Sequence, residues 1–206
     1  MHGNCSNRIQ SRNRISGAIQ EHWLYLRKLM HHGAAIASAA PSSRWVARDM
    51  LYGIDFPCTS TVVELGAGTG PITAEILRAA GGRCRCLIVE RDRDFCRLLR
   101  ARFPAAEVIE ADALDYRRLL DDRGVGRVDH VLCELPLPWF TPEARHQLLG
   151  AVCDRLTDGG SFRQLTRLPG LHRALYEPYF DDIRVRVILR NLPPAGCYIC
   201  REPRLR

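Results

Sequence analysis

The residues with the clearest chemical meaning lie in the stretch 61–73, where a carboxylate precedes a run rich in glycine. Gly66, Gly68 and Gly70 stand at alternate positions, so the backbone can turn sharply and approach a ligand without interference from Cβ atoms. Glu64 comes two residues before the first of them. Its charge would repel a pyrophosphate, but it would attract a ligand that carries an ammonium group and a sulfonium group.

The elements around these glycines are those of a nucleotide-binding corner. Val62, Val63 and Leu65 form a short apolar run, which is typical of a buried parallel strand. Pro71 suits the first turn of a helix, where its missing N–H costs nothing. A dinucleotide-binding fingerprint would need glycine at this position. The pattern Glu-x-Gly-x-Gly-x-Gly therefore favours a different nucleotide-bearing ligand at the edge of an open α/β sheet.

A second carboxylate stands where ribose binding is expected. The stretch Arg85–Glu90 is an apolar run that ends in an acid, and this acid follows Gly66 by 24 residues. In open-sheet nucleotide sites, an acid at about this spacing accepts hydrogen bonds from the ribose hydroxyls. We predict this role for Glu90; the alternative is an exposed acid at the end of a strand.

A third group of candidate residues follows the expected strand Val128–Cys133, at the carboxyl edge of the sheet, where ligands bind. Glu134 is either a general base or amine anchor, or an acid on the surface of the loop. Trp139 and Phe140 would either hold a methylated cation by cation–π contact or close the apolar wall of the pocket.

Apolar patterns along the chain predict one doubly wound α/β domain with a mostly parallel seven-stranded sheet, its last strand antiparallel. We expect a disordered tail at residues 1–13, N-terminal helices within 14–52 and the ligand-binding domain at 53–206. After the first strand, the expected strands lie at 85–90, 107–109, 128–133, 161–166, 183–189 and 197–201. The later helices are expected at 71–80, 92–103 and 142–156, with a turn at 158–160.

The charge is unevenly distributed along the 206 residues. The net charge is +7, and the first 50 residues hold seven cationic against two acidic side chains. Such an arm either binds an anionic membrane surface or nucleic acid, or is simply solvated. Within it, apolar residues including Trp23 recur every three or four positions over 14–32, which predicts an amphipathic helix. That helix would lie on an anionic membrane or pack on its own domain.

Nine cysteines without a secretory signal predict a reducing, cytoplasmic setting. If the amphipathic helix binds lipid, we expect the protein to be peripheral on the inner face of the membrane. No stretch approaches the roughly 20 apolar residues of a spanning helix. Cys84-x-Cys86 and Cys197-x-x-Cys200 could together bind a metal. Both pairs lie in expected strands, however, so we predict buried apolar cysteines and no metal.

Together these motifs resemble the class I S-adenosylmethionine-dependent methyltransferases. Within that class the chain is similar to bacterial phospholipid N-methyltransferases, which act on phosphatidylethanolamine. The resemblance covers roughly residues 24–201. The stretches Glu64–Gly70 and Val89–Asp92 belong to the superfamily at large, whereas Pro41-Ser42-Ser43 and Arg190–Ala195 favour this branch.

The resemblance implies S-adenosylmethionine as the methyl donor and an amine as the acceptor. Asp112 would contact the adenine amino group, while small neighbours leave room for the ring. The implied cofactor-binding residues are Glu64, Gly66, Ala67, Gly68, Gly70, Glu90, Arg91, Asp112 and Ala113. The implied acceptor pocket is bordered by Leu135, Pro136, Trp139, Phe140 and Arg167, with Glu134 as the catalytic residue.

Two departures from the family bear on the acceptor rather than on the cofactor. Glu134 stands where the family has glycine before Leu-Pro, and Gln164–Arg167 replaces an aromatic-rich Gln-Phe-Thr-Tyr stretch. A soluble small molecule or RNA adenine are alternative acceptors, although the loop lacks the asparagine and the immediate aromatic residue of adenine-N6 RNA methyltransferases. A cofactor-binding protein with little catalysis is the remaining alternative.

Overall fold

The computed structural model describes residues 44–189 and 194–204. By internal contacts the chain divides between Ala40 and Pro41, and all described residues belong to the second unit. The predicted tail at 1–13 and the amphipathic helix at 14–32 lie outside the described residues, as does most of the stretch Arg190–Ala195.

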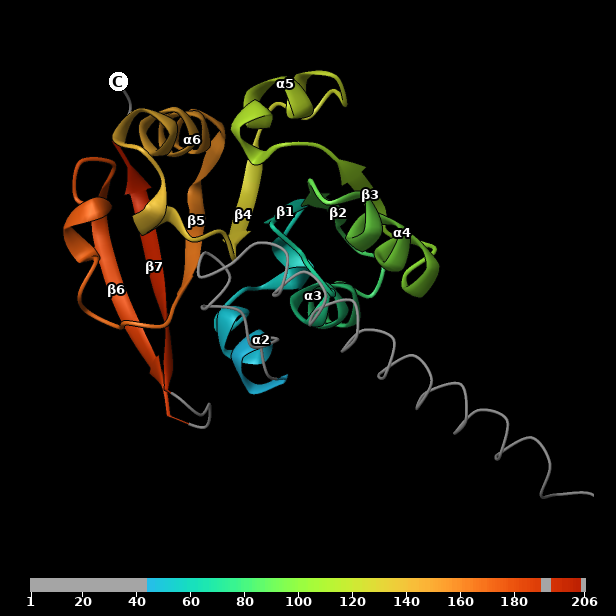
Figure 1. Cartoon of the computed structure of the whole chain (residues 1–206), viewed down its shortest axis with the longest axis horizontal. Helices are drawn as coiled ribbons and strands as arrows, with labels where there is room; N and C mark the ends of the chain where they lie inside the picture. Colours follow the sequence, from blue (N-terminus) through green and yellow to red (C-terminus); the bar gives the residue numbers. More distant parts are fainter. Residues whose placement is uncertain (1–43, 190–193, 205–206) are drawn as a thin grey trace, which may run out of the picture. The chain divides into compact units, whose positions relative to one another are not determined.

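Seven strands form one sheet in the order β3-β2-β1-β4-β5-β7-β6 (Figure 1). All neighbours up to β5 are parallel, whereas β7 is antiparallel to both β5 and β6. The predicted doubly wound sheet with an antiparallel last strand is therefore confirmed. The strands are β1 Thr61–Leu65, β2 Arg85–Glu90, β3 Glu107–Glu110, β4 Val128–Cys133, β5 Leu156–Thr166, β6 Phe180–Ile188 and β7 Ala195–Pro203.

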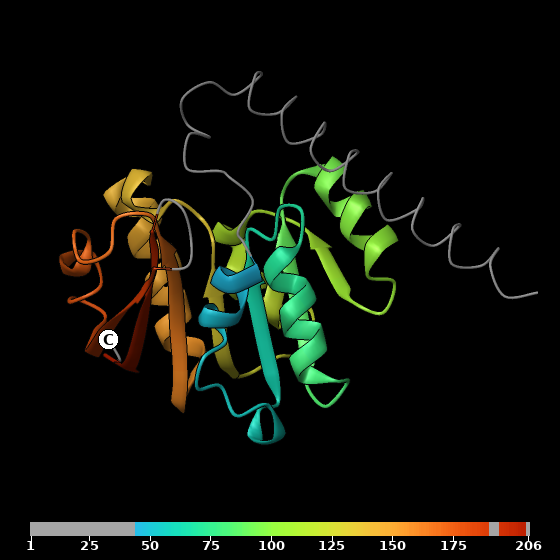
Figure 2. The same cartoon turned by 90° about the horizontal axis from the view of Figure 1, so that it is seen from below.

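Helices cover both faces of the sheet. One face packs against α2 Arg44–Met50, α3 Pro71–Ala80 and α4 Arg93–Arg102; α2 and α3 lie in front of β1 in Figure 2. The other packs against α5 Tyr116–Asp121 and α6 Pro142–Arg155. Since β1 is fully buried, its five residues read as an apolar run with one acid.

Local signals place the helix ends close to their predicted positions. Proline occupies the start of α3, and Gly81 in the left-handed region ends it. The Asp92 side chain caps α4 by accepting hydrogen bonds from the N–H groups of Asp94 and Phe95. Thr141 caps α6 in the same way through the N–H of Ala144.

The predictions for the last three strands were partly wrong. β5 begins at Leu156 rather than Ser161, because the predicted turn at 158–160 is a bulge inside the strand: Val128 pairs with Leu156, but the next pair is His130 with Ser161. β6 and β7 are longer than the ranges 183–189 and 197–201 predicted. The short helix α5 was not predicted.

None of the helices in the described ranges combines the length and hydropathy needed to cross a membrane. Within the same ranges, no three His, Cys, Asp or Glu side chains are grouped as metal ligands would be. Cys86, Cys197 and Cys200 are buried, and burial raises the pKa of the Cys197 thiol to about 12, which keeps it protonated.

Candidate active site

The glycine turn lies where the strand order reverses, between β1 and β4, which is where open α/β sheets bind nucleotides. All three glycines have positive φ, at +81° for Gly66, +54° for Gly68 and +84° for Gly70. A Cβ at Gly66 would lie 2.7 Å from Leu135 Cδ2, and one at Gly70 would lie 2.7 Å from Leu99 Cδ2. Among the described residues, a Cβ at Gly68 would meet nothing within 4 Å. The first and third glycines therefore serve packing, and the second borders open space that a ligand can enter.

Glu90 at the end of β2 holds this turn. Its Oε2 accepts the Gly68 N–H at 2.9 Å, and its Oε1 accepts the Asp92 N–H at 2.8 Å. The residue is only 8% exposed. Each carboxylate oxygen can accept a second hydrogen bond, so the group can bind ribose hydroxyls while it fixes the glycine turn.

Glu64 is a carboxyl group buried in the core at the end of β1. Thr73 Oγ1 donates to its Oε2 at 2.6 Å, while its Oε1 has no hydrogen-bond partner among the described atoms. Burial raises the pKa of Glu64 to about 7; hydrogen bonding with Thr73 and with the Glu134 carboxyl opposes this, and the charge of Glu90 adds to it. An unpaired oxygen in such a place suits a cationic or hydrogen-bonding ligand.

Glu134 follows β4 and joins Glu64 across the switch point. Its N–H donates to the Leu65 carbonyl at 3.0 Å, which brings the start of the loop beside the end of β1. The side chain is half-buried and its carboxyl interacts with that of Glu64. The structure thus brings together two predicted site residues that are 70 positions apart in the sequence.

The residues predicted to hold adenine lie after β3. The Leu114 N–H donates to Asp112 Oδ1 at 2.9 Å, and the other oxygen of this carboxylate lies 4.0 Å from Arg91 Nη1. Asp112 and Arg91 are both well exposed, whereas Ala113 is buried. The carboxylate therefore remains accessible to a ligand amino group, with a small residue next to it.

The loop after β4 is built on buried anchors. Leu137 is fully buried and Phe140 packs against the core, but Trp139 is 80% exposed. Within the described chain, the indole therefore does not pack into an apolar wall, and its contact with a substrate cation stays a prediction. Pro136 is exposed, and Arg167 is half-buried at the end of β5.

Sequence reasoning missed Thr73 and Arg163, and it named Gln164 only as part of a departure from the family. Thr73 on α3 bonds to Glu64, and Gln164 on β5 donates to the Leu135 carbonyl at 2.9 Å, which fixes the loop after β4. Arg163 is fully buried and donates to the carbonyls of Met50 and Tyr52. The available signal was the presence of Arg163 and Gln164 inside an otherwise apolar strand.

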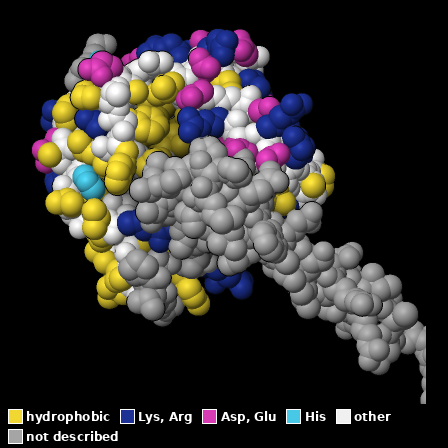
Figure 3. All heavy atoms as spheres, in the orientation of Figure 1, with side chains coloured by type: hydrophobic (Ala, Val, Ile, Leu, Met, Phe, Trp, Pro, Cys, Tyr) yellow, Lys and Arg dark blue, Asp and Glu magenta, His cyan; other side chains and the backbone are white. Residues whose placement is uncertain are grey.

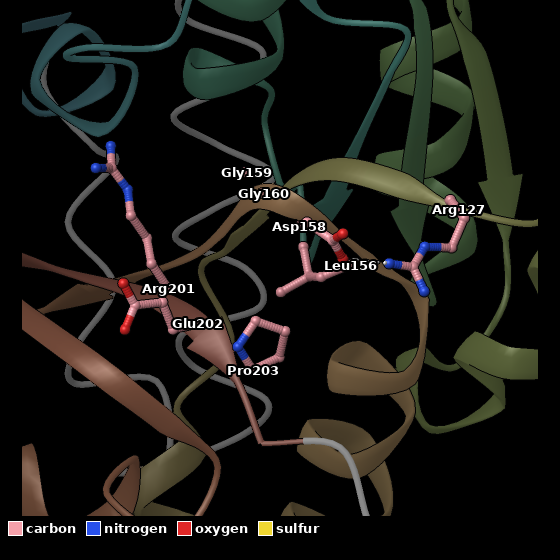
Figure 4. Close-up of a pocket in the computed structure, with 8 residues that line it drawn as sticks. All are labelled: Arg127, Leu156, Asp158, Gly159, Gly160, Arg201, Glu202 and Pro203. Carbon is pink, nitrogen blue, oxygen red and sulfur yellow. Dashed lines mark hydrogen bonds and ion pairs between the residues drawn. The ribbon is translucent and has the colours of Figure 1, made fainter.

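A hollow of about 450 Å³ lies at the opposite, amino edge of the parallel strands (Figure 4). Arg127 pairs there with Asp158 at 3.2 Å, and the guanidinium group of Arg201 lies at the other end of the group of side chains drawn. The two cations do not converge, and the lining includes no predicted site residue. The remaining lining residues are Leu156, Gly159, Gly160, Glu202 and Pro203.

Comparison with known proteins identifies the class. A family model described as a methyltransferase domain matches residues 62–160. A curated relative is 41% identical over 186 residues, which span 89% of this chain and 97% of the relative. The chain therefore belongs to the class I S-adenosylmethionine-dependent methyltransferases, and S-adenosylmethionine is its methyl donor. That relative is the ornithine lipid N-methyltransferase of Singulisphaera acidiphila.

Two further likenesses are less extensive. The ribosomal RNA small subunit methyltransferase A of Marinobacter nauticus is 38% identical over 93 residues, which span 43% of this chain and 31% of that protein. The crystal structure of TrmN from Thermus thermophilus superposes with a TM-score of 0.63 and 21% identity, covering 82% of this chain and 51% of that one. The second of these shows the shared fold alone.

Proposed function

We propose that this protein methylates the amine of a lipid headgroup, with an ornithine-type aminolipid as the first candidate acceptor. The observation that carries the proposal is the similarity to an ornithine lipid N-methyltransferase over nearly the whole length of both chains. Phosphatidylethanolamine, the acceptor that the sequence motifs suggest, is the second candidate of the same chemical class.

The carboxyl groups at the switch point support an amine acceptor. A primary ammonium with an ordinary pKa near 10 is protonated at neutral pH and has no lone pair to offer. The half-buried Glu134 can hold this ammonium by a charge-assisted hydrogen bond and take its proton. Glu64 would hold the Glu134 carboxyl in place, because the two carboxyl groups interact. Thr73 in turn bonds to Glu64.

The methyl donor would be held by the glycine turn and by the residues that follow β2 and β3. When bound, S-adenosylmethionine supplies a methyl group that is already activated for transfer to a nucleophile. Gly68 offers open space, Glu90 offers acceptors for the ribose hydroxyls, and Asp112 offers an acceptor for an adenine amino group. The chain's task is to align donor and acceptor, which can contribute about 7–11 kcal/mol to lowering the barrier.

The test is to incubate the purified protein with labelled donor and, in parallel, with ornithine lipid, phosphatidylethanolamine, bulk RNA or small soluble amines. We expect label in a lipid amine. The Glu134→Gln variant should lose roughly 100-fold or more in methyl transfer, within the range for a lost general base, while keeping its affinity for S-adenosylhomocysteine. Glu143→Gln is the matched control, because Glu143 is an exposed acid on α6. Label only in RNA or soluble amines would contradict the proposal.

Methylation of RNA adenine is the second candidate, and the local similarity to a ribosomal RNA methyltransferase favours it. That similarity covers less than half of this chain. The loop Glu134-Leu-Pro-Leu also carries a carboxylate where adenine-N6 enzymes carry an asparagine. In the parallel assay, this candidate requires transfer to RNA that weakens steeply as salt is raised.

A further inference from the structure

Large hydrophobic side chains are exposed in a pattern that packing does not explain. In the described ranges there are seven, and two of them, Trp45 and Tyr52, lie in or just after α2. The other five follow or end the strands β4, β5 and β6. We call these five the apolar rim; they are Trp139 (80% exposed), Leu168 (53%), Leu171 (68%), Val187 (51%) and Leu189 (78%).

The sheet brings these residues to one edge. Since β5 and β6 are both antiparallel to β7, they run in the same direction and end at the same edge. Gly196 pairs with Thr166 at the end of β5 and with Val187 on β6. A Cβ at Gly196 would lie 2.9 Å from Pro169 Cβ, so the turn at 168–171 lies directly over this point.

Val187 and the turn at 168–171 also share one face of the sheet. Side chains alternate along a strand, so Val187 lies on the same face as Ile183, which packs in the core under α6. Trp139 follows Leu137, a member of the same core cluster. In Figure 3 hydrophobic side chains run down the left side of the molecule, over the lower part of β6 and the segment joining β5 to β6.

This edge is also the edge of the candidate active site. Glu134 and Trp139 belong to one loop, and Gln164, two residues before the end of β5, is bonded to that loop. An acceptor that reaches Glu134 therefore passes close to the apolar rim. A lipid has to place its acyl chains in an apolar phase while its headgroup amine enters such a site.

We propose that the apolar rim is the surface by which the protein docks on an anionic lipid bilayer, with the active-site edge of the sheet facing the headgroups. The inference rests on the proposed lipid acceptor. The net charge of +7 on the chain, five of it from the first 50 residues, complements an anionic surface. An exposed indole among leucine and valine is suited to the headgroup boundary, where its ring enters the apolar phase and its N–H stays near polar groups. Exposed apolar patches of this kind mark interaction surfaces.

The first test compares the full chain with a Leu168→Ser/Leu171→Ser double variant in binding to vesicles of phosphatidylglycerol and phosphatidylcholine. Both leucines are exposed, so the fold and the affinity for S-adenosylhomocysteine should stay unchanged. Vesicle binding should weaken roughly tenfold or more, because two leucine side chains that would enter the lipid phase are lost. Tyr52→Ser is the matched control: Tyr52 is 60% exposed and stacks on Arg186, which faces the opposite side of β6 from Val187. Equal binding by wild type and double variant overturns the proposal.

The second test makes Trp139 a reporter in a Trp23→Phe/Trp45→Phe background, since the chain holds three tryptophans. Vesicles should shift the emission of Trp139 to the blue, and brominated lipids should quench it. Emission that is already blue-shifted and shielded from iodide without vesicles would show that another part of the chain or a second copy covers the rim, and would overturn the proposal. Light scattering on the same sample then separates these two occupants.

The two proposals can fail separately. If the wild type binds vesicles through the rim but transfers label only to RNA, the proposed acceptor is wrong. If it methylates ornithine lipid dispersed in detergent while rim variants bind vesicles normally, the acceptor stands and the docking surface is wrong.

Discussion

Three glutamates meet at this site, and their surroundings give them different tasks. Glu90 accepts two backbone N–H groups and so holds the glycine turn. Glu64 is fully buried, with one oxygen bonded to Thr73 and the other without a hydrogen-bond partner in the described part of the chain. Glu134 is half-buried at the start of the loop after β4, where the proposed acceptor would enter. In the function proposed here, one residue type would therefore serve cofactor binding, positioning and proton transfer, depending on burial and partners.

The first prediction concerns Glu90. Replacement by alanine removes the ribose acceptor and releases the Gly68 N–H, so affinity for S-adenosylhomocysteine should fall at least about 100-fold; hydrogen bonds to a charged group contribute about 1.5–3 kcal/mol each. Titration calorimetry measures this. Glu110→Ala is the control, because Glu110 is an exposed acid at the end of the neighbouring strand β3. Comparable affinities in the two variants would mean that Glu90 has only a structural role.

The second prediction uses the raised pKa of Glu64. Because the folded-state pKa of about 7 exceeds the ordinary value of 4.5, the unfolded chain releases this proton first as pH rises. The stability that the neutral group contributes is fully present below about pH 4.5 and is lost towards pH 7. Glutamine does not titrate, so the melting temperature of Glu64→Gln minus that of wild type should grow across this window and then level off. A difference that is constant with pH would contradict the assignment.

At the scale of elements, the glycine turn separates packing from binding. Gly70→Ala forces a Cβ against Leu99 and Phe103 at positive φ, so it should lower stability by about 2 kcal/mol or more. Gly68→Ala meets no neighbour and should cost only about 1 kcal/mol from its φ. The Gly68→Ala variant should instead bind S-adenosylhomocysteine more weakly than the wild type does. Thermal melts and calorimetry on both variants test this; the prediction fails if the two variants behave alike.

The strands β1 to β4 could be predicted from the sequence, whereas β5 could not be predicted in full. Parallel strands buried on both faces appear as apolar runs that end in charged residues, as Arg85–Glu90 does. The bulge at 157–160 contains Asp158, Gly159 and Gly160, which are typical turn residues. Only the pairing of Leu156 and Ser161 with β4, on either side of that stretch, keeps it within the strand.

The next prediction concerns Arg163, which ties the segment around Met50 and Tyr52 to the sheet. It donates to the carbonyls of Met50 and Tyr52 at 2.9 and 2.7 Å. Arg163→Met leaves both acceptors without this donor and should lower stability by about 2 kcal/mol, despite relieving a buried charge. Arg184→Met is the control, since that side chain is 72% exposed. Scanning calorimetry checks it, and equal melting temperatures of wild type and Arg163→Met would contradict it.

At the scale of the whole molecule, the parts of the site that sequence could predict are those at strand ends. Glu64, Glu90 and Asp112 follow one another at the spacing of an open sheet, so their proximity follows from topology. The contact between Glu64 and Glu134 follows from the same rule, because β1 and β4 are neighbours. Thr73, Arg163 and Gln164 could not be found this way, since their partners depend on side-chain packing between distant elements.

The last prediction links cofactor binding to the stability of the whole domain. A ligand that binds only the folded state adds about 2.7 kcal/mol at 100 times its dissociation constant. For a chain of about this size, each kcal/mol raises the melting temperature by about 2–4 °C. S-adenosylhomocysteine at that excess should therefore raise it by roughly 5–11 °C in wild type, in Glu110→Ala and in the Leu168→Ser/Leu171→Ser variant. At the same concentration the shift should nearly vanish in Glu90→Ala. A full shift in that variant would show that the ligand binds elsewhere in the fold, and a missing shift in the rim variant would show that the rim belongs to the cofactor site.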